Sequence, residues 1–349
     1  MPIFFTKQQD LYSFYSFVSI MTEDLKIIDE KDRKILAELD KNSGETDSDI
    51  AKKVRLSKQV VNYRIQKLVE KGIIERFYTI INTGNFGLNS FYIFLQFQKL
   101  NKEKEKILLE KINSLDYVGW LVHGTGRWDC IVQIYSGSIF EFNSFLNNIL
   151  KICGENLHEY NFTTLLTGEH LSYKFITGSK GVDKIIQTEK REKIKIDEID
   201  KKILKVLSQN ARLSLVDISK KSNVSLHKVN YHLDKLTKNK IIEGFKPKIN
   251  SNKLNYEWNL LLIQFQNINE KRKNEFLEYC KNNSKIYYVT TTVGVYNLML
   301  DIYVKNVEEF REVLFELKEK FSDVIKIYES MIIFKEFKIN YFPEKLINP

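Results

Sequence analysis

The first candidates for chemistry are polar and basic side chains on one face of a predicted helix in residues 57–75, SKQVVNYRIQKLVEKGIIE. At about 100° per residue, Val61, Ile65 and Leu68 share a narrow apolar face. The opposite face carries amide, phenol and ammonium groups, which can hydrogen-bond base edges and neutralise phosphates. These groups belong to Gln59, Asn62, Tyr63, Gln66 and Lys67. The pattern predicts a DNA-reading helix, with an ordinary amphipathic helix and a solvated outer face as the alternative.

The same stretch occurs again 168 residues later as SLHKVNYHLDKLTKNKIIE, residues 225–243. Other segments follow the same register, because residues 200–207 repeat residues 32–39 and Gly294 falls on Gly126. A fixed offset maintained over most of the chain is the mark of an internal duplication. We therefore interpret the chain as two copies of one unit.

Two further helical patterns precede the first DNA-reading stretch. Residues 29–39 carry apolar side chains at helical spacing, and residues 46–54 begin with a T-x-x-D capping pattern. Helix, short helix, tight turn and longer helix is the order of a helix-turn-helix motif. After Gly72, residues 73–82 are rich in β-formers and are predicted to form the wing.

The region after each predicted wing changes to alternating strand and helix patterns. In the first copy the order is strand, helix, two strands around a glycine turn, helix and strand, at residues 90–100, 101–114, 117–136, 138–153 and 160–176. The βαββαβ order predicts a ferredoxin-like domain, an antiparallel sheet covered by helices on one side. Its bare face needs a partner, so we expect this domain to associate.

The predicted fold class is therefore α+β, with two winged helix-turn-helix domains each followed by a ferredoxin-like βαββαβ sensor domain. Residues 1–23 are either a mis-called start or a mobile arm. The remaining boundaries are 24–87 for the first winged helix-turn-helix, 88–176 for the first sensor domain, 177–195 for a charged linker that could include a short helix, 196–255 for the second winged helix-turn-helix and 256–349 for the second sensor domain.

Composition limits the kind of partner and compartment. The 54 Lys and Arg against 45 Asp and Glu give a net charge of +9, which tilts the expectation towards a polyanionic partner. Cys130, Cys153 and Cys280 form no C-x-x-C pair, which favours a reducing, cytoplasmic location, and no metal site or cofactor is expected. No apolar run reaches the length of a membrane span, so no membrane partner is expected.

The chain resembles the Lrp/AsnC, or feast/famine, transcription regulators. The resemblance rests on V-x-x-R-I-x-x-L from Val61 to Leu68, with a glycine and I-I just after, and on G-x-x-D at Gly126 and Asp129. It covers residues 24–176 and again 192–338. Members usually carry one unit and dimerise, so two units in one chain depart from the pattern. We expect an internal pseudo-dimer through the sensor domains, with a higher oligomer left open.

The resemblance implies a sequence-specific DNA-binding transcription regulator that is not an enzyme and that responds to a small effector, such as an amino acid, held near the G-x-x-D turn. Glycine N–H groups can hold a carboxylate, and an aspartate can pair with an ammonium group. Carried over by position, the effector residues are Gly124, Gly126 and Asp129, then Thr292, Gly294 and Asn297. The alternative is a tight hairpin in which glycine serves geometry alone. Asn297 lacks a carboxylate, which weakens amino-acid capture in the second unit.

The partner expected for the first domains is double-stranded DNA. The predicted contacts in the first unit are Ser57, Lys58, Gln59, Asn62, Tyr63, Arg64, Lys67 and the wing residue Arg76. In the second unit they are Ser225, His227, Lys228, Asn230, Tyr231, His232, Lys235 and the wing residues Lys246 and Lys248. His232 replaces Arg64, and Asp234 lies towards the groove where phosphates repel it, so the two helices are not expected to read the same bases.

Two other function classes remain as alternatives. Siroheme decarboxylases resemble this architecture, sometimes as fused pairs, and Tyr296, Asn297 and Leu298 loosely resemble a tyrosine-containing stretch of theirs. Such an enzyme needs histidines and arginines around a macrocycle, and the strand MLDIYV after Leu298 offers none. The third class is a sensor scaffold that no longer binds DNA, which the altered second helix keeps open.

Overall fold

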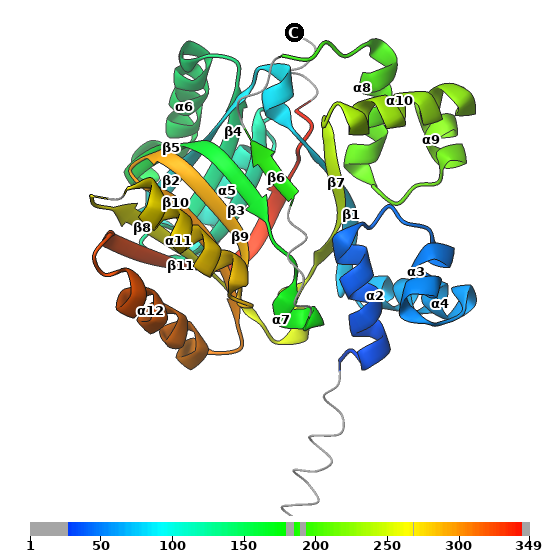
Figure 1. Cartoon of the computed structure of the whole chain (residues 1–349). Coiled ribbons are helices and arrows are strands. Elements are labelled where there is room, and N and C mark those ends of the chain that lie inside the picture. Colours follow the sequence, from blue (N-terminus) through cyan, green and yellow to red (C-terminus); the bar gives the residue numbers. More distant parts are fainter. Residues whose placement is uncertain (1–26, 179–184, 189–192, 268, 344–349) are drawn as a thin grey trace, which may run out of the picture.

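Three helices begin each half of the chain, and the residues that cap and fill them match the sequence pattern. The computed structural model describes residues 27–178, 185–188, 193–267 and 269–343 (Figure 1). The first half has α2 (Glu30–Lys41), α3 (Asp47–Val54) and α4 (Lys58–Glu70), and the second has α8 (Glu198–Gln209), α9 (Leu215–Ser222) and α10 (Leu226–Lys238). Val61, Ile65 and Leu68 are buried, as the helical spacing predicted. The expected arm at residues 1–23 lies outside the described residues.

The strands expected to form wings instead pair with one another. β1 (Ile74–Ile81) and β7 (Ile242–Ile249) form a two-stranded antiparallel ribbon in which Tyr78 lies opposite Lys246. These two residues are separated by the repeat offset of 168 in the sequence, so the pseudo-twofold axis passes between them. The first helix of each half packs against the ribbon strand of the other half, because α2 contacts β7 and α8 contacts β1. Each DNA-reading domain is therefore completed by a strand from the other half.

Both sensor regions have the predicted βαββαβ order. The first contains β2 (Asn89–Phe97), α5 (Lys102–Asn113), β3 (Val118–Gly126), β4 (Cys130–Ser136), α6 (Ile139–Cys153) and β5 (Leu157–His170). The second contains β8 (Glu257–Phe265), α11 (Glu270–Asn282), β9 (Ile286–Gly294), β10 (Leu298–Val304), α12 (Val307–Phe321) and β11 (Ile325–Ile339). The helix α7 (Lys174–Thr177) ends where the predicted linker begins. Inside the linker the structure has a strand, β6 (Ile185–Thr188), which pairs with β5, where the sequence suggested a short helix.

The two sensor sheets join edge to edge and close on each other. Their strand order runs β2-β4-β3-β11-β8-β10-β9-β5, and β5 pairs back onto β2. The contacts between the halves are β3 with β11 and β5 with β9, so each half supplies the same two edges. Closure leaves none of these eight strands with an unpaired edge. The bare sheet faces therefore share one interior, which is how this structure realises the expected pseudo-dimer.

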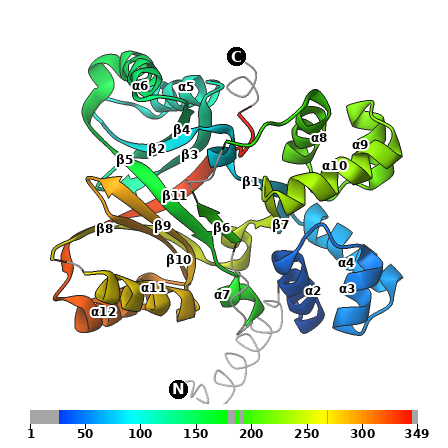
Figure 2. The ribbon, with the colours of Figure 1, turned by 45° about the horizontal axis from the view of Figure 1, so that its top comes forward.

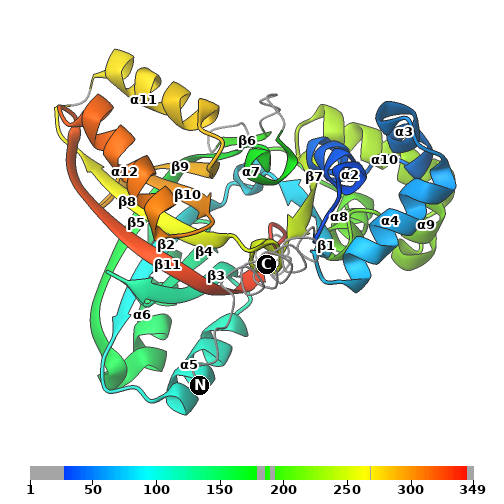
Figure 3. The same cartoon turned by 90° about the horizontal axis from the view of Figure 1, so that it is seen from below.

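Helices cover the outside of this barrel, and aromatic side chains fill part of its inside. Helices α5 and α6 pack over the first sheet, and α11 and α12 pack over the second (Figure 2). The two helical domains lie together on the far side of the β1/β7 ribbon from the barrel (Figure 3). No helix within the described ranges is long and apolar enough to cross a membrane. The ribbon is thus the structural connection between DNA-reading helices and sensor barrel.

Candidate nucleic-acid interface and effector sites

The exposed face of α4 carries most of the predicted DNA contacts. Ser57 caps the helix by accepting the N–H of Val60 at 3.3 Å, which fixes where the helix begins. The exposed side chains on and next to this helix include Lys58, Gln59, Asn62, Tyr63 and Lys67. Tyr63 is 58% exposed, although it is an aromatic residue in a helix with a well-formed core. A surface of amide, phenol and ammonium groups is suited to duplex DNA.

Arg64 occupies a different place from the other predicted contacts of α4. Its guanidinium donates to Asp29 at 2.7 Å and to Asp32 at 2.8 Å, and its side chain is only 22% exposed. Burial alone would raise the pKa of Asp29, but the N–H of Asp32 and the Arg64 guanidinium outweigh it and lower that pKa. Asp29 and Asp32 also form the capping box of α2. Arg64 therefore fastens α4 to α2, and we do not carry it forward as a DNA contact.

The second half makes the same connection with two different residues. His232 is buried, and its Nδ1 lies 2.7 Å from an oxygen of Asp200. Lys235 donates to the other Asp200 oxygen at 2.7 Å and to Asp197 at 3.3 Å. Asp197, Asp200 and His232 thus bring ligand atoms within 4.8 Å of one another, the spacing of a metal site. The Lys235 ammonium already pairs with both carboxylates, so we assign the cluster to holding α10 on α8 and not to DNA or metal binding.

The exposed face of α10 keeps five of the seven predicted helix contacts. Ser225, His227, Lys228, Asn230 and Tyr231 are exposed, and Tyr231 is 62% accessible. Asn230 and Tyr231 correspond to Asn62 and Tyr63 at the repeat offset. The identical pair on both helices indicates a shared mode of docking, whereas His227 in place of Gln59 indicates different base preferences.

The three predicted wing contacts lie in the ribbon and differ in accessibility. Lys246 is 1% exposed and forms an ion pair with Asp40 at 2.8 Å, so its burial removes it from the DNA-contact set. Lys248 is partly buried and pairs with Glu336 of the sensor barrel at 2.6 Å. Arg76 is exposed and donates to the carbonyl oxygen of Ile339 at 3.1 Å. Lys246 and Lys248 therefore form ion pairs within the protein and are not assigned to DNA contacts.

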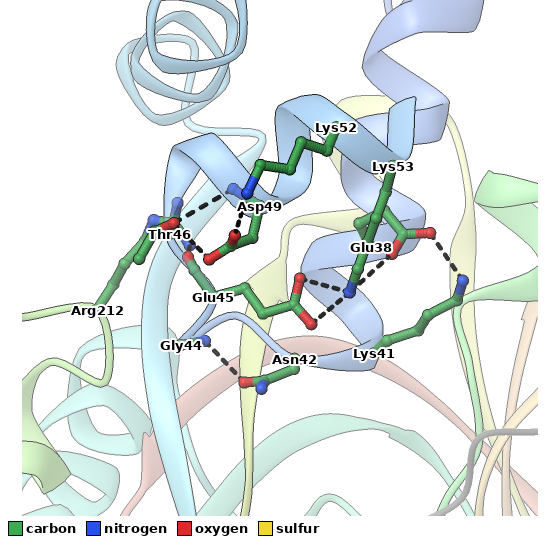
Figure 4. A network of polar contacts seen from close by, with 10 residues as sticks. All are labelled: Glu38, Lys41, Asn42, Gly44, Glu45, Thr46, Asp49, Lys52, Lys53 and Arg212. Atoms are coloured by element: carbon green, nitrogen blue, oxygen red, sulfur yellow. Dashed lines mark hydrogen bonds and ion pairs between the residues drawn. The ribbon is translucent and has the colours of Figure 1, made fainter. Parts of the chain in front are cut away.

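A polar network at the start of α3 connects the two helical domains (Figure 4). Arg212 of the second half donates to the carbonyl oxygens of Ser43 at 2.6 Å and Glu45 at 2.9 Å, and it pairs with Asp47. Asp47 in turn accepts from Asn62 on α4 at 2.7 Å. Sequence reasoning missed Arg212. The register offered a signal, because the corresponding residue in the first half is Gly44.

Replacing Arg212 with alanine is expected to lower the free energy of unfolding by about 2–3 kcal/mol, because hydrogen bonds to a charged group are lost at a partly buried junction. Urea unfolding of the whole chain measures this change. Arg212→Lys keeps the positive charge but loses the planar guanidinium group, which donates several hydrogen bonds at once. The decrease in the free energy of unfolding should therefore be smaller than that of Arg212→Ala. Equal stability of all three proteins would contradict the assignment of Arg212 as the connection between the domains.

The predicted effector turns meet at the end of the barrel away from the ribbon. Trp128 lies in the first turn, between Gly126 and Asp129. It donates its indole N–H at 2.7 Å to the hydroxyl of Tyr296, which has the equivalent position in the second turn. Asp129 accepts the N–H of Phe97 at 2.7 Å, and Asn297 accepts the N–H of Phe265 at 2.8 Å. The Asp129 carboxylate and the Asn297 amide oxygen thus accept equivalent backbone N–H groups and stabilise the two hairpins in the same way.

The glycines of these turns have a structural role that is independent of any ligand. Gly126 has φ of 145° and Gly294 has φ of 141°, a region that L-residues rarely adopt. A Cβ on Gly124 or Gly126 would also overlap the backbone of β11, the antiparallel neighbour of β3 at these positions. The geometric interpretation of these glycines is therefore supported, while a ligand role for them stays a prediction.

One of the two turns adjoins a cavity. A cavity of about 210 Å³ lies between β5, β9 and α11, with Thr292 and Asn297 in its wall. Glu270 and Lys273 from the start of α11 line the same cavity and offer one charge of each sign. These two side chains pair with each other at 3.9 Å, so the second turn adjoins a cavity whose charges are already partnered.

Comparisons with known proteins find a matching family and similar regulators. The winged helix-turn-helix DNA-binding family matches residues 28–75 and 196–243. An uncharacterized HTH-type transcriptional regulator of Pyrococcus horikoshii is 30% identical over 127 residues, which cover 36% of this chain and 85% of that protein. An AsnC family transcriptional regulator from Agrobacterium tumefaciens aligns over 39% of this chain and 89% of its own, with 23% identity and a TM-score of 0.35.

The fold of most of the chain is similar to that of one further solved structure. The siroheme decarboxylase NirDL covers 91% of this chain and 96% of its own, with a TM-score of 0.61 and 17% identity. A second structure of that protein is a co-complex with an iron-uroporphyrin III analogue. At this identity the likeness describes the fold.

Proposed function

Because the chain belongs to the Lrp/AsnC family of helix-turn-helix transcription regulators, we propose that one chain binds double-stranded DNA with both α4 and α10 and reads an imperfectly palindromic site. The observation that carries the proposal is the pair of exposed polar helices, α4 and α10, held in one pseudo-symmetric body by the ribbon and the closed barrel. A dimeric regulator needs two chains to present two such helices. This chain presents both by itself.

The difference between the halves supports an asymmetric reader. Lys58 corresponds to Leu226, Gln59 to His227 and Gln66 to Asp234, while Asn62 and Tyr63 keep their identity in the second half. The contacts that we carry forward are Ser57, Lys58, Gln59, Asn62, Tyr63, Lys67 and Arg76 in the first half and Ser225, His227, Lys228, Asn230 and Tyr231 in the second. The exposed Tyr63 and Tyr231 dock both helices alike, and the differing residues select different bases.

Base readout gives the test of sequence specificity. Gln59→Ala is expected to reduce discrimination between the best site and single-base variants by about 1–3 kcal/mol at one position, and to change non-specific affinity little. Gln59→His is the matched variant, because it places in the first helix the residue that the second helix has at this position. Its preferred half-site should move towards that of α10. Equal loss of affinity for every sequence would make Gln59 a positioning residue and not a base reader.

We further propose that a small effector, such as an amino acid, binds at the sensor turns. The cavity beside Thr292 and Asn297 supports it, because its lining has one charge of each sign, Glu270 and Lys273, which pair with each other at 3.9 Å and which a zwitterion would have to separate. Effector binding in the barrel would bias the position of the ribbon and thereby the angle between α4 and α10. A differential affinity of a few kcal/mol is enough for such a shift.

A siroheme decarboxylase-like enzyme is the second candidate function. The full-length fold likeness to NirDL favours it, whereas the 30% identical regulator from Pyrococcus horikoshii favours the first. Absorbance spectra after incubation with siroheme separate the two. Stoichiometric tetrapyrrole binding followed by loss of carboxyl groups would support the enzyme, and spectra unchanged from free siroheme would support the regulator.

A further inference from the structure

A second cavity lies at the opposite end of the barrel from the effector turns, where the ribbon covers the barrel interior. It has a volume of about 60 Å³. Tyr78 and Lys248 of the ribbon line one side, and Trp120, Trp258, Asp301 and Glu336 of the barrel line another. A water-sized sphere occupies about 10–15 Å³ on this measure. The space is therefore suited to a molecule of about four to six non-hydrogen atoms.

The walls of this ribbon cavity are mostly aromatic. The rings of Trp120 and Trp258 lie 6.2 Å apart, and Trp258 stacks on Tyr303 at 5.7 Å. Tyr287 meets Tyr303 edge to face at 5.9 Å. The faces of such rings are electron-rich and attract cations, and they also pack against short hydrocarbon groups. The wall chemistry therefore favours a compact organic cation over an anion.

One carboxylate in the cavity, that of Asp301, forms no ion pair with a lysine or arginine in the part of the chain that the structure describes. Asp301 is 6% exposed, and its Oδ1 accepts the indole N–H of Trp258 at 2.6 Å. Burial raises the pKa of Asp301 to about 7, while the Trp258 hydrogen bond and Lys248 act in the opposite direction. The corresponding residue in the first half is Gln133, which also lines the cavity. The acid is thus confined to one half of an otherwise pseudo-symmetric cavity.

The other charged side chains in the lining do not neutralise the Asp301 carboxylate. Lys248 is already paired with Glu336 at 2.6 Å, and Glu336 also accepts the indole N–H of Trp120 at 2.8 Å. Burial, with Lys246 and Lys248 nearby, holds the pKa of His170 well below its usual value, so this side chain is neutral. Ionised Asp301 therefore leaves one net negative charge in the described lining. A single positive charge inside the cavity would neutralise it.

We propose that the ribbon cavity is a binding site for a small protonated monoamine, with its ammonium group on Asp301 and its carbon atoms against the aromatic rings. The site is distinct from the sensor turns, because the turns lie at the other end of the barrel. A neighbouring cavity of about 240 Å³ shares Lys248, Trp258, Tyr303 and Glu336 with it. The Lys248–Glu336 ion pair thus lines both spaces.

The strand β7 connects the ribbon cavity to the DNA-reading domains. Lys248 belongs to β7, which continues from α10 and packs against α2. A ligand between Lys248 and Asp301 therefore contacts the ribbon and the barrel at once. This coupling rests on the proposed DNA-binding function, whereas the binding itself does not.

Titration of the full chain with methylammonium, ethylammonium, propylammonium and tetramethylammonium chloride tests the site. Trp120 and Trp258 line the cavity, so intrinsic tryptophan fluorescence reports occupancy, and calorimetry gives the affinity. Propanol and potassium chloride are the neutral and cationic controls. Saturable binding of at least one amine, absent with both controls, is the expected result. No saturable binding of any amine, or an equal response to propanol, would overturn the proposal.

Two variants locate the site. Asp301→Gln gives the second half the residue of the first and should weaken amine binding by about tenfold or more. Glu103→Gln removes an exposed carboxylate on α5, outside every site described, and should leave amine affinity unchanged. Unchanged affinity in a folded Asp301→Gln protein would overturn the proposal, and the wild-type comparison of amine with propanol decides it if this variant does not fold. DNA affinity with and without amine is measured separately, so failure of DNA binding leaves the cavity test intact.

Discussion

Replacing Asp40 with alanine is expected to lower the free energy of unfolding by about 3–5 kcal/mol, the largest stability loss that we predict. Asp40 and Lys246 have side chains that are 2% and 1% exposed, and their charged atoms lie 2.8 Å apart. Asp40 also accepts the N–H of Tyr173 at 2.7 Å. Removal of the carboxylate leaves a buried ammonium group and a buried N–H without this partner. Chemical denaturation of the purified chain measures the loss.

The repeat supplies the control for this pair. The corresponding residues in the other half are Ser208 and Tyr78, so Asp40→Ser combined with Lys246→Tyr replaces the ion pair with side chains that the chain already uses at equivalent places. The double variant should recover much of the stability lost in Asp40→Ala. Lys34→Ala, which removes an exposed ion pair with Glu30, should change stability far less. A similar small change for Asp40→Ala would contradict the importance of the buried pair.

Loss of Lys58 and Lys228 together is expected to give the largest change in DNA affinity. Both ammonium groups are exposed at the beginning of a recognition helix, where phosphates flank the major groove. Each lysine that contacts a phosphate should contribute about one unit to the slope of log affinity against log salt. Lys58→Gln with Lys228→Gln should therefore reduce that slope by about two and weaken binding by about tenfold or more at low salt.

Fluorescence anisotropy of labelled duplex DNA across a salt series gives both quantities. Lys106→Gln with Lys111→Gln removes the same charge from exposed positions on α5 of the sensor domain and should leave the slope unchanged. If the two double variants reduced the slope equally, general charge and not the recognition helices would explain the affinity.

Periodicity and register predicted the fold class because both are local or repeated features. The buried face of Val61, Ile65 and Leu68 follows from helical spacing, and the repeat offset of 168 predicted two equivalent units. The partner of a single strand is not encoded in its own pattern. Residues 73–82 therefore predicted a strand correctly, while its pairing with β7 of the other half could be found only in the structure.

The candidate DNA site was predictable in outline but not residue by residue. Arg64 and His232 lie at the border between the apolar and polar faces of their helices, where a helical pattern cannot distinguish a solvent-facing cation from a buried one. Their acidic partners Asp32 and Asp200 come from another helix. Lys246 carried the charge expected of a wing, yet exchange of the ribbon strands places it beside Asp40. The amine cavity needs residues from both halves and had no local signal.

Hydroxyl-radical footprinting of one chain on its best DNA site tests the central claim most directly, provided that light scattering of the same complex fixes the number of chains bound. We predict that a single chain protects two patches about 34 Å apart, one turn of the double helix, with unlike half-sites under α4 and α10. Protection of a single patch, two identical half-sites, or absence of protection even at low salt would contradict an asymmetric reader built within one chain.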